Sequence, residues 1–262
     1  MTGTVYLVGA GPGAPDLLTV RAVRLLGEAD IVFHDALIHP DTLTLAARAE
    51  KIPVGKRSGR LSTAQRFINK RLADAARRYR VVVRLKGGDP MLFGRAQEEI
   101  DFLRSRNVAV RVVPGVTAAL AASAELGISL TRRGLARSVT FVTPRVGAGE
   151  PESSWVKAVV SADTAAIYMG AGEGPAIAAA LIAAGKPPSA PVAIVENASL
   201  DSASVAYGTL ERLPRLSGGP VLILIGEAYR QAVEVARASE LSTRESGSNP
   251  IAKKSASGSD FF

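Results

Sequence analysis

Glycines cluster in three short segments of the sequence, and each could bring the backbone close to a ligand. The first, residues 9–14, reads Gly-Ala-Gly-Pro-Gly-Ala and follows a predicted strand at residues 5–8. It satisfies the loose Gly-x-Gly-x-x-Gly/Ala pattern of dinucleotide sites, and Asp35 lies about twenty residues on, where a ribose-binding acid would sit. Pro12 argues against that interpretation, because it removes a backbone N–H from the turn that should hold a pyrophosphate. A glycine-rich turn that binds nothing is the alternative.

The second and third segments carry polar side chains beside their glycines. Gly87 and Gly88 end a predicted strand, where they remove the side chains that would block a flat ligand, and Asp89 can accept hydrogen bonds at the same edge. An ordinary turn is the alternative. Residues 114–119 form another strand-to-helix turn, whose free N–H groups and Thr117 hydroxyl either face a ligand or cap the helix. Since each segment follows a strand, the three can converge on one crevice.

Short β-branched runs alternate with amphipathic stretches, a pattern typical of parallel α/β layers. The predicted strands are residues 5–8, 31–33, 51–54, 81–86 and 109–113 in the first half, and 138–143, 165–169, 192–196 and 221–226 in the second. The predicted helices are residues 17–27, 63–79, 98–104, 116–126 and 175–184. Within the first of them, we expect Thr19 to be the N-cap, because Pro15 and Asp16 extend the preceding loop.

The fold class that follows is α/β, with two α/β domains that meet near residues 112–118. We expect an N-terminal domain at residues 1–114 and a C-terminal domain at residues 115–238. From Ser239 the chain turns to Ser, Gly and Lys without apolar periodicity, which predicts a disordered tail at residues 239–262.

The composition excludes several kinds of chemistry. The 262-residue chain contains no cysteine, which rules out disulfides, thiolate metal ligands and cysteine nucleophiles. Its two histidines are too few for a histidine-rich site, so no metal is predicted. We find neither a secretory signal nor an apolar stretch of the roughly twenty residues that span a membrane. The expected location is therefore the cytoplasm, without membrane attachment.

The formal net charge of +8 comes from one half of the chain. Residues 1–135 hold 21 Lys and Arg against 12 Asp and Glu, whereas the remaining residues hold 11 against 12. The excess is mostly arginine, which suits a surface that binds an anion through forked hydrogen bonds. Aromatic residues make up only 5% and hardly interleave with the arginines, so stacking of nucleic-acid bases lacks platforms. A small polyanion fits this charge as well as nucleic acid does.

Longer strings carry a resemblance to a known family. Residues 5–19 read Val-Tyr-Leu-Val-Gly-Ala-Gly-Pro-Gly-Ala-Pro-Asp-Leu-Leu-Thr, and residues 54–59 read Val-Gly-Lys-Arg-Ser-Gly. Further matching strings follow in order at residues 84–95, 114–119, 138–143, 168–170 and 192–197. Together they resemble the tetrapyrrole methylases over about residues 4–230, and residues 54–59 and 84–95 resemble the uroporphyrinogen-III C-methyltransferase branch in particular.

The resemblance implies that S-adenosylmethionine binds in a cleft between the two domains. The implied cofactor positions are Pro12, Gly87, Gly88, Asp89, Leu92, Thr117, Ala118, Met169 and Ala198. Ala198 stands where the family usually has glycine. The family also implies an acid–base pair at Asp35 and Lys56, a homodimer, and two successive methylations of uroporphyrinogen III. The product would be precorrin-2, the branch point towards sirohaem and cobalamin.

The sequence departs from the branch pattern on the expected substrate side. Ala36 follows Asp35 where an arginine is usual, so Arg57 or Arg60 is expected to orient the carboxylate, unless Asp35 merely caps a helix. Arg132 and Arg145 replace histidines of the branch and keep positive charge there. Arg57, Arg132 and Arg145 are thus the residues expected to meet the carboxylates of an anionic tetrapyrrole, with plain surface arginines as the alternative.

Three other functions remain open at this point. Another precorrin methyltransferase of the same fold would act at a different ring carbon. A nicotinamide-dependent dehydrogenase would use Asp35 for the ribose and would be stabilised by NAD. A basic nucleic-acid-binding module would show affinity that falls steeply with salt.

Overall fold

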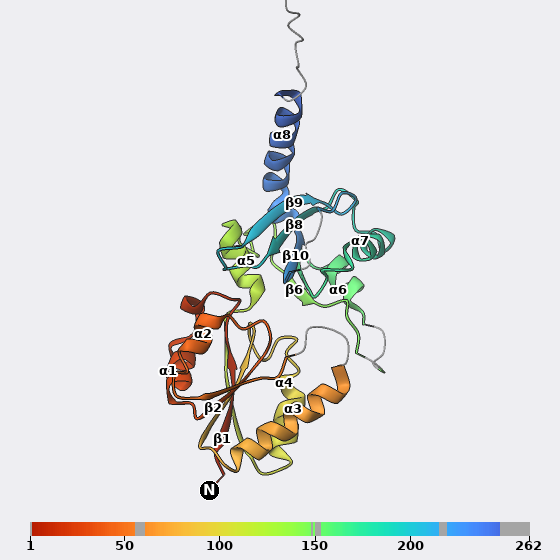
Figure 1. Ribbon diagram of the computed structural model, residues 1–262. Helices are drawn as coiled ribbons and strands as arrows, with labels where there is room; N and C mark the ends of the chain where they lie inside the picture. The colour runs from red at the N-terminus through yellow and green to blue at the C-terminus, as the bar shows by residue number, and fades with distance from the viewer. Residues whose placement is uncertain (1, 56–60, 148, 150–152, 215–218, 247–262) are drawn as a thin grey trace, which may run out of the picture.

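The computed structural model describes residues 2–55, 61–147, 149, 153–214 and 219–246 (Figure 1). Its strands form two five-stranded sheets, each covered by its own helices, as the α/β prediction requires. The two units lie end to end in Figure 1, with the N-terminus at the far end of the first. In the described part of the chain, no helix has the length and apolar character needed to cross a membrane.

The first sheet is parallel throughout. Its order is β3 (Glu50–Pro53), β2 (Ile31–His34), β4 (Val81–Lys86), β1 (Thr4–Gly9) and β5 (Ala109–Val113). Gly9 of β1 pairs with Lys86 of β4, and His34 of β2 pairs with Leu85. This register brings the carboxyl ends of the strands to one edge of the sheet, which is the edge where α/β proteins bind ligands.

Helices cover both faces of this sheet. They are α1 (Val20–Glu28), α2 (Pro40–Thr44), α3 (Leu61–Ala76) and α4 (Ala96–Arg104), with a short 3₁₀ helix η1 (Pro15–Leu17) before α1. The Thr19 hydroxyl accepts a hydrogen bond from the Ala22 N–H at 3.1 Å, which confirms the predicted N-cap. Leu25 and Leu26 of α1 pack on one face, whereas α3 and α4 cover the other with Leu72 and Leu103.

The second sheet is mixed, so the prediction of parallel layers is wrong for this half. Its order is β6 (Val139–Val142), β7 (Thr164–Tyr168), β10 (Val221–Gly226), β8 (Pro191–Glu196) and β9 (Ser204–Thr209). Only β6 and β7 pair in parallel, and the other neighbours are antiparallel. The short connection between β8 and β9 accounts for the antiparallel pairing of these two strands, since a parallel crossover needs a dozen or more residues. We did not predict β9, α2 or the helix α6 (Trp155–Ser161) from the sequence.

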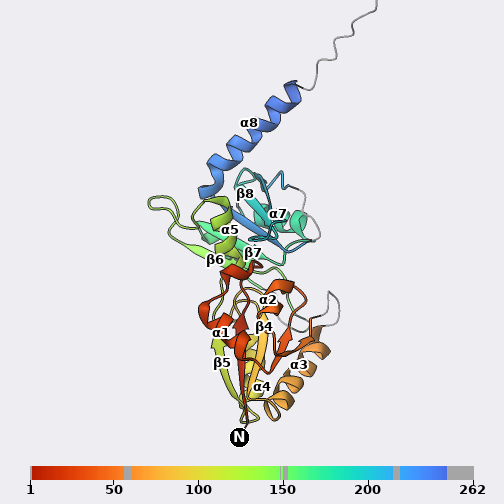
Figure 2. The same cartoon turned by 60° about the vertical axis from the view of Figure 1, so that its left-hand side comes forward.

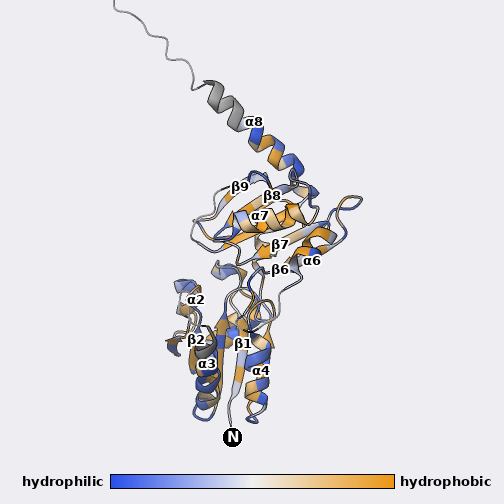
Figure 3. Cartoon of the chain, turned by 90° about the vertical axis from the view of Figure 1, so that its right-hand side faces the viewer, coloured by the Kyte–Doolittle hydropathy of each residue, from blue (hydrophilic) through white to orange (hydrophobic). Residues whose placement is uncertain are grey.

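Both faces of the second sheet are covered as well. α6 and α7 (Gly174–Ala183) pack on one face, and the strands and α7 are largely apolar in Figure 3. The other face holds Ala119 and Ala122 of α5 (Ala118–Leu126) with the fully buried Tyr229 of the 3₁₀ helix η2 (Glu227–Tyr229). The chain therefore passes from the first unit to the second between Val113 of β5 and the start of α5.

The last helix, α8 (Arg230–Ser246), extends from the second unit away from the first (Figure 2). It runs past Ser239, so the prediction of disorder from that residue is wrong as far as Ser246. The following residues include Glu, Leu and Arg, which favour helix, and adding residues to an existing helix avoids the cost of nucleation. Residues 247–262 lie outside the described part of the chain.

Candidate active site

The three glycine segments meet at the carboxyl edge of the first sheet. The Gly88 N–H donates to the Gly11 carbonyl at 2.7 Å, and the Gly11 N–H donates back to the Gly88 carbonyl at 3.2 Å. A Cβ added to Gly9 would lie 2.7 Å from the Cα of Gly115 and from the Gly88 carbonyl oxygen. Only residues without a side chain allow this approach. The predicted convergence of the three turns is therefore present in the structure.

Asp89 ties two of these turns together. Its carboxylate accepts hydrogen bonds from the Gly115 N–H at 2.9 Å and from the Met91 N–H at 2.8 Å. The Asp89 side chain therefore holds the loop in place through its own hydrogen bonds, and the groups of the loop that can face a ligand are those of the backbone. At Gly87, an added Cβ would meet no atom of the described residues within 4 Å. The loop therefore presents a bare backbone face to open space.

The second unit brings its own loops to the same place. The hydroxyls of Thr117 and Tyr168 hydrogen-bond at 2.7 Å, and the Tyr168 oxygen accepts from the Ala119 N–H at 3.1 Å. Burial raises the pKa of Tyr168. The Phe93 ring, from the loop that contains Gly88, lies 5.2 Å from the Tyr168 ring between centroids. These contacts hold the loops of the two units against each other.

Left-handed backbone conformations mark the loops at this junction. Met169, which directly follows β7, has φ 58°, and its side chain is 39% exposed. Asn197 and Ser199 flank the buried Ala198 with φ 51° and 72°. The Ser199 hydroxyl accepts a hydrogen bond from the Ala14 N–H at 3.1 Å, which joins the loop after β8 to the loop after β1. Strained residues of this kind collect at functional sites.

Asp35 follows β2 at the same edge, and its ion-pair partner among the described residues is Arg84. Its Oδ1 forms an ion pair with the Arg84 guanidinium of the neighbouring strand β4. The Arg84 side chain is 3% exposed and that of Asp35 32% exposed, so a buried cation holds a carboxylate that reaches the surface. Arg57 and Arg60, which we expected to orient Asp35, lie outside the described residues.

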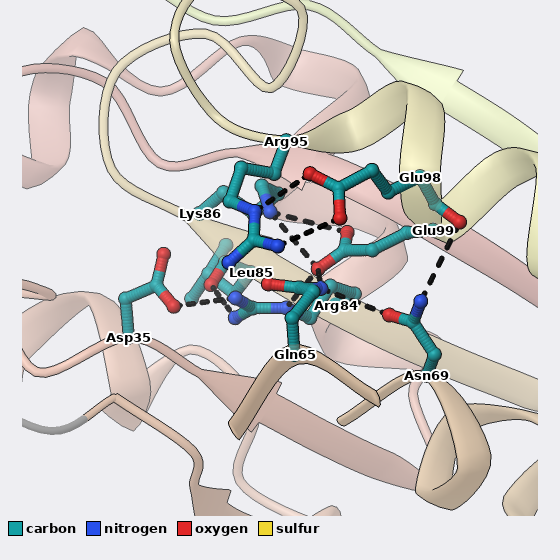
Figure 4. Close-up of polar contacts among 9 residues, drawn as sticks. All are labelled: Asp35, Gln65, Asn69, Arg84, Leu85, Lys86, Arg95, Glu98 and Glu99. Carbon is teal, nitrogen blue, oxygen red and sulfur yellow. Dashed lines mark hydrogen bonds and ion pairs between the residues drawn. The ribbon is translucent and has the colours of Figure 1, made fainter. Parts of the chain in front are cut away.

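A buried polar cluster lies beneath this pair (Figure 4). The Glu99 carboxylate accepts from Arg84 Nε at 3.2 Å, from Lys86 Nζ at 3.1 Å and from Gln65 Nε2 at 3.0 Å. Burial is the main cause that lowers the pKa of Lys86, followed by the Arg84 charge, and Glu99 opposes both. The expectations from the sequence did not include this cluster. The available signal was two cations at alternate positions of a strand that is otherwise valine and leucine.

The remaining predicted site residues are only partly placed. Lys56 lies outside the described residues, but a Cβ added to its neighbour Gly55 would lie 3.1 Å from the Asp35 Cα. Arg132 is exposed and lines a cavity with Tyr207 of β9 and Gln231 of α8, and none of the glycine segments lines that cavity. Arg145 lies on an exposed turn, where its N–H donates to the Thr143 hydroxyl at 3.2 Å. Pro12 and Leu92 are half-buried in the loops that meet at the junction, and Ala118 is half-buried at the first position of α5.

Two α/β units whose strand-end loops meet around bare glycine backbone make up the fold and the candidate site, and the family model that matches them is one of methylases. The family of Tetrapyrrole (Corrin/Porphyrin) Methylases matches residues 4–214, and the chain belongs to it.

Similar proteins of known name include siroheme synthases and uroporphyrin III C-methyltransferases. The siroheme synthase of Psychrobacter cryohalolentis is 43% identical over 94% of this chain, and that of Pseudomonas aeruginosa is 44% identical over 87%. The chain spans about half the length of these relatives, 48% and 50%. The uroporphyrin III C-methyltransferase of Thermus thermophilus is 39% identical, with a TM-score of 0.77 over 87% of this chain and 94% of that one. A structure of that enzyme holds S-adenosylhomocysteine.

Proposed function

We propose that this chain transfers methyl groups from S-adenosylmethionine to uroporphyrinogen III, twice, to give precorrin-2. The observation that carries the proposal is the meeting of three glycine segments beside a carboxylate, Asp35, that is held at the same sheet edge. Family membership and the likeness to the Thermus thermophilus enzyme support the same reaction. An anionic tetrapyrrole as substrate, a homodimer and a cytoplasmic location belong to this proposal.

The residues at the junction fit the cofactor. The bare face of Gly87 leaves room for a flat group, and the turns around Gly88, Thr117 and Met169 offer backbone groups and a thioether side chain beside it. We assign the cofactor to Pro12, Gly87, Gly88, Asp89, Leu92, Thr117, Ala118, Met169 and Ala198, with Asp89 acting by fixing its loop. When bound, the cofactor would supply a sulfonium methyl group to an electron-rich carbon in line, with the neutral thioether S-adenosylhomocysteine as the leaving group.

Asp35 is the residue that we assign to proton transfer. Its Oδ1 is engaged by Arg84, whereas its Oδ2 has no hydrogen-bond partner among the described residues. An ionised carboxylate held on one oxygen leaves the other to accept a proton from the pyrrole ring as its carbon gains the methyl group. We assign Lys56 to the same proton path, because its neighbour Gly55 packs against the Asp35 backbone.

Asp35→Asn tests the assignment. The amide keeps the shape of the side chain and removes the proton acceptor, so kcat should fall about 10²–10⁴-fold while S-adenosylmethionine affinity stays nearly unchanged. The assay is single-turnover methylation of enzymatically generated uroporphyrinogen III, read by product mass and absorption. A wild-type rate in Asp35→Asn would remove Asp35 from the chemistry.

The same assay separates the proposal from its nearest rival. Cobalt precorrin-4 methyltransferase is 26% identical to this chain with a TM-score of 0.71, so a reaction at another ring carbon is the second candidate. Two methyl groups on uroporphyrinogen III would support the proposal. No transfer to uroporphyrinogen III together with transfer to a later precorrin would favour the rival.

A further inference from the structure

Glu99 lies beneath the proposed active site and takes no part in the reaction as assigned so far. It belongs to α4 and its side chain is 0% exposed. Its partners are the buried cations Arg84 and Lys86 and the amide of Gln65 (Figure 4). An ionised carboxylate in such a place is very unfavourable without counter-charges. The two cations provide them, and Asp35 is the second anion that balances the group.

Arg84 stands between the two anions with its donors divided among three acceptors. Nε donates to Glu99 at 3.2 Å, Nη1 donates to the Leu85 carbonyl at 3.1 Å, and Nη2 donates to Asp35. Because the guanidinium is planar and rigid, fixing Nε on one side fixes the direction of Nη2 on the other. The Glu99 contact therefore determines where Arg84 holds the Asp35 carboxylate.

We propose that Glu99 is a positioning residue for methyl transfer: it anchors Arg84, and through Arg84 it orients the Asp35 carboxylate. This inference rests on the proposed function. Lys86 completes the arrangement, because its ammonium contacts both Glu99 oxygens at 3.1 Å and so restrains the rotation of the carboxylate. Gln65 restrains it further and is itself held by Asn69 at 2.8 Å.

Glu99→Gln is the change that tests the idea, since it keeps the shape and removes the charge. Arg84 and Lys86 both donate to Glu99 Oε1, and Lys86 also donates to Oε2. A glutamine turns its NH₂ either towards Lys86, which it repels, or towards Arg84, which then loses its acceptor, and in both orientations the negative charge that holds the two cations is gone. The anchor of Arg84 is therefore weakened, and with it the direction in which Arg84 holds the Asp35 carboxylate. We expect kcat to fall by up to about 100-fold, as small misplacements of reacting groups do. KM for uroporphyrinogen III and the Kd for S-adenosylmethionine should stay at their wild-type values.

A double-mutant cycle distinguishes positioning from a general structural role. If Glu99 acts through Asp35, then Glu99→Gln should lower kcat further by less than about 2-fold once Asp35→Asn is present, because coupled residues are not additive. Equal fold-losses of kcat with and without Asp35→Asn would overturn the proposal. Glu98→Gln is the matched control. It makes the same change one residue earlier, at an exposed carboxylate paired with Arg95, and should leave kcat unchanged.

A second measurement uses the protein without substrate. In ¹⁵N NMR of the arginine side chains, assigned with an Arg84→Gln variant, the Arg84 Nε–H should exchange slowly in the wild type and in Glu98→Gln. It should exchange quickly in Glu99→Gln. Slow exchange in Glu99→Gln would overturn the inference, whatever the activity.

The proposal stays testable if Glu99→Gln does not fold, and also if the wild-type protein shows no activity. If Glu99→Gln does not fold, Lys86→Met/Glu99→Gln removes one cation and one anion together and is measured in the same two ways. A wild-type protein that methylates no tetrapyrrole would refute the proposed function, and the NMR comparison would still decide whether Glu99 anchors Arg84.

Discussion

Gly87→Ala tests the proposed cofactor site with the smallest possible change. An added Cβ at Gly87 meets no atom of the described residues within 4 Å, and the backbone there is not in the left-handed region. Alanine should therefore be accepted by the fold, and it restricts the unfolded chain, which favours the folded state by about 0.4–1 kcal/mol. Gly88 is a poorer choice, because its φ of 65° would strain any other residue.

The expected loss follows from the room that a ligand would need. If S-adenosylmethionine packs against the bare face of Gly87, the new methyl group enters occupied space. Overpacking of this kind costs about 1–3 kcal/mol. At 1.4 kcal/mol per tenfold, this corresponds to a roughly 5- to 150-fold weaker Kd.

Calorimetric titration with S-adenosylmethionine and thermal unfolding of the same samples give the two quantities needed. Gly27→Ala is the control, because Gly27 lies on α1 away from the glycine segments and its added Cβ also meets nothing within 4 Å in the described structure. It should keep the wild-type Kd. Gly87→Ala protein with a Tm at or above that of the wild type and an unchanged Kd would show that the cofactor does not contact this loop.

Two further predictions concern stability. The Tyr229 hydroxyl is buried and has no hydrogen-bond partner among the described residues, so Tyr229→Phe should raise the free energy of unfolding by about 1 kcal/mol in denaturant titrations. Burial also raises the pKa of Tyr229 to about 12, so the unfolded tyrosine ionises first as pH rises from 10. The free energy of unfolding of the wild type should therefore fall between pH 10 and about 12 relative to that of Tyr229→Phe. A difference between the two proteins that stays constant over this pH range would show that burial does not raise the pKa of Tyr229. The Asp163 carboxylate accepts from the Arg137 and Ser138 N–H groups, which lower its pKa from 3.8. The stability that the Asp163 carboxylate contributes is complete above pH 3.8 and is lost as pH falls through the lower folded-state pKa. The Tm gap between wild type and Asp163→Asn should therefore narrow as pH falls below 3.8, and a gap that does not narrow would contradict this.

The strands that the sequence predicted well are those in which a run of apolar residues coincides with burial in the centre of a sheet. Residues 81–86 and 221–226 coincide with β4 and β10, because central strands are buried on both faces and each of these two contains a continuous run of at least three valine, isoleucine or leucine residues. The edge strand β9 was missed. Its sequence, Ser-Val-Ala-Tyr-Gly-Thr, lacks such a run, and only its pairing with β8 makes it a strand.

The residues of the candidate site likewise fall into those that the sequence could predict and those that it could not. The glycine segments could be predicted, because a residue without a side chain allows close approach of the backbone at that same position, whatever the rest of the fold. The Asp35–Arg84 pair could not, since its members are 49 residues apart and meet only through the register of β2 against β4. Glu99 is a similar case, because its role depends on how α4 packs on the sheet. A strand with two buried cations does, however, demand carboxylates nearby, and that demand is visible in the sequence.

The central place of β10 in the second sheet has a consequence for how the protein is made. All five strands of the first sheet have been synthesised once Val113 is added. In the second sheet, the first strand β6 ends at Val142, but the central strand β10 is complete only when Gly226 has been added. The intervening stretch of about 80 residues takes a ribosome roughly 4–16 s at its usual rate. During that interval the first unit can fold, but β7 and β8 have unpaired edges and no shared partner. We expect nascent chains stopped before Val221 to contain a protease-resistant first unit and an aggregation-prone, chaperone-dependent second one.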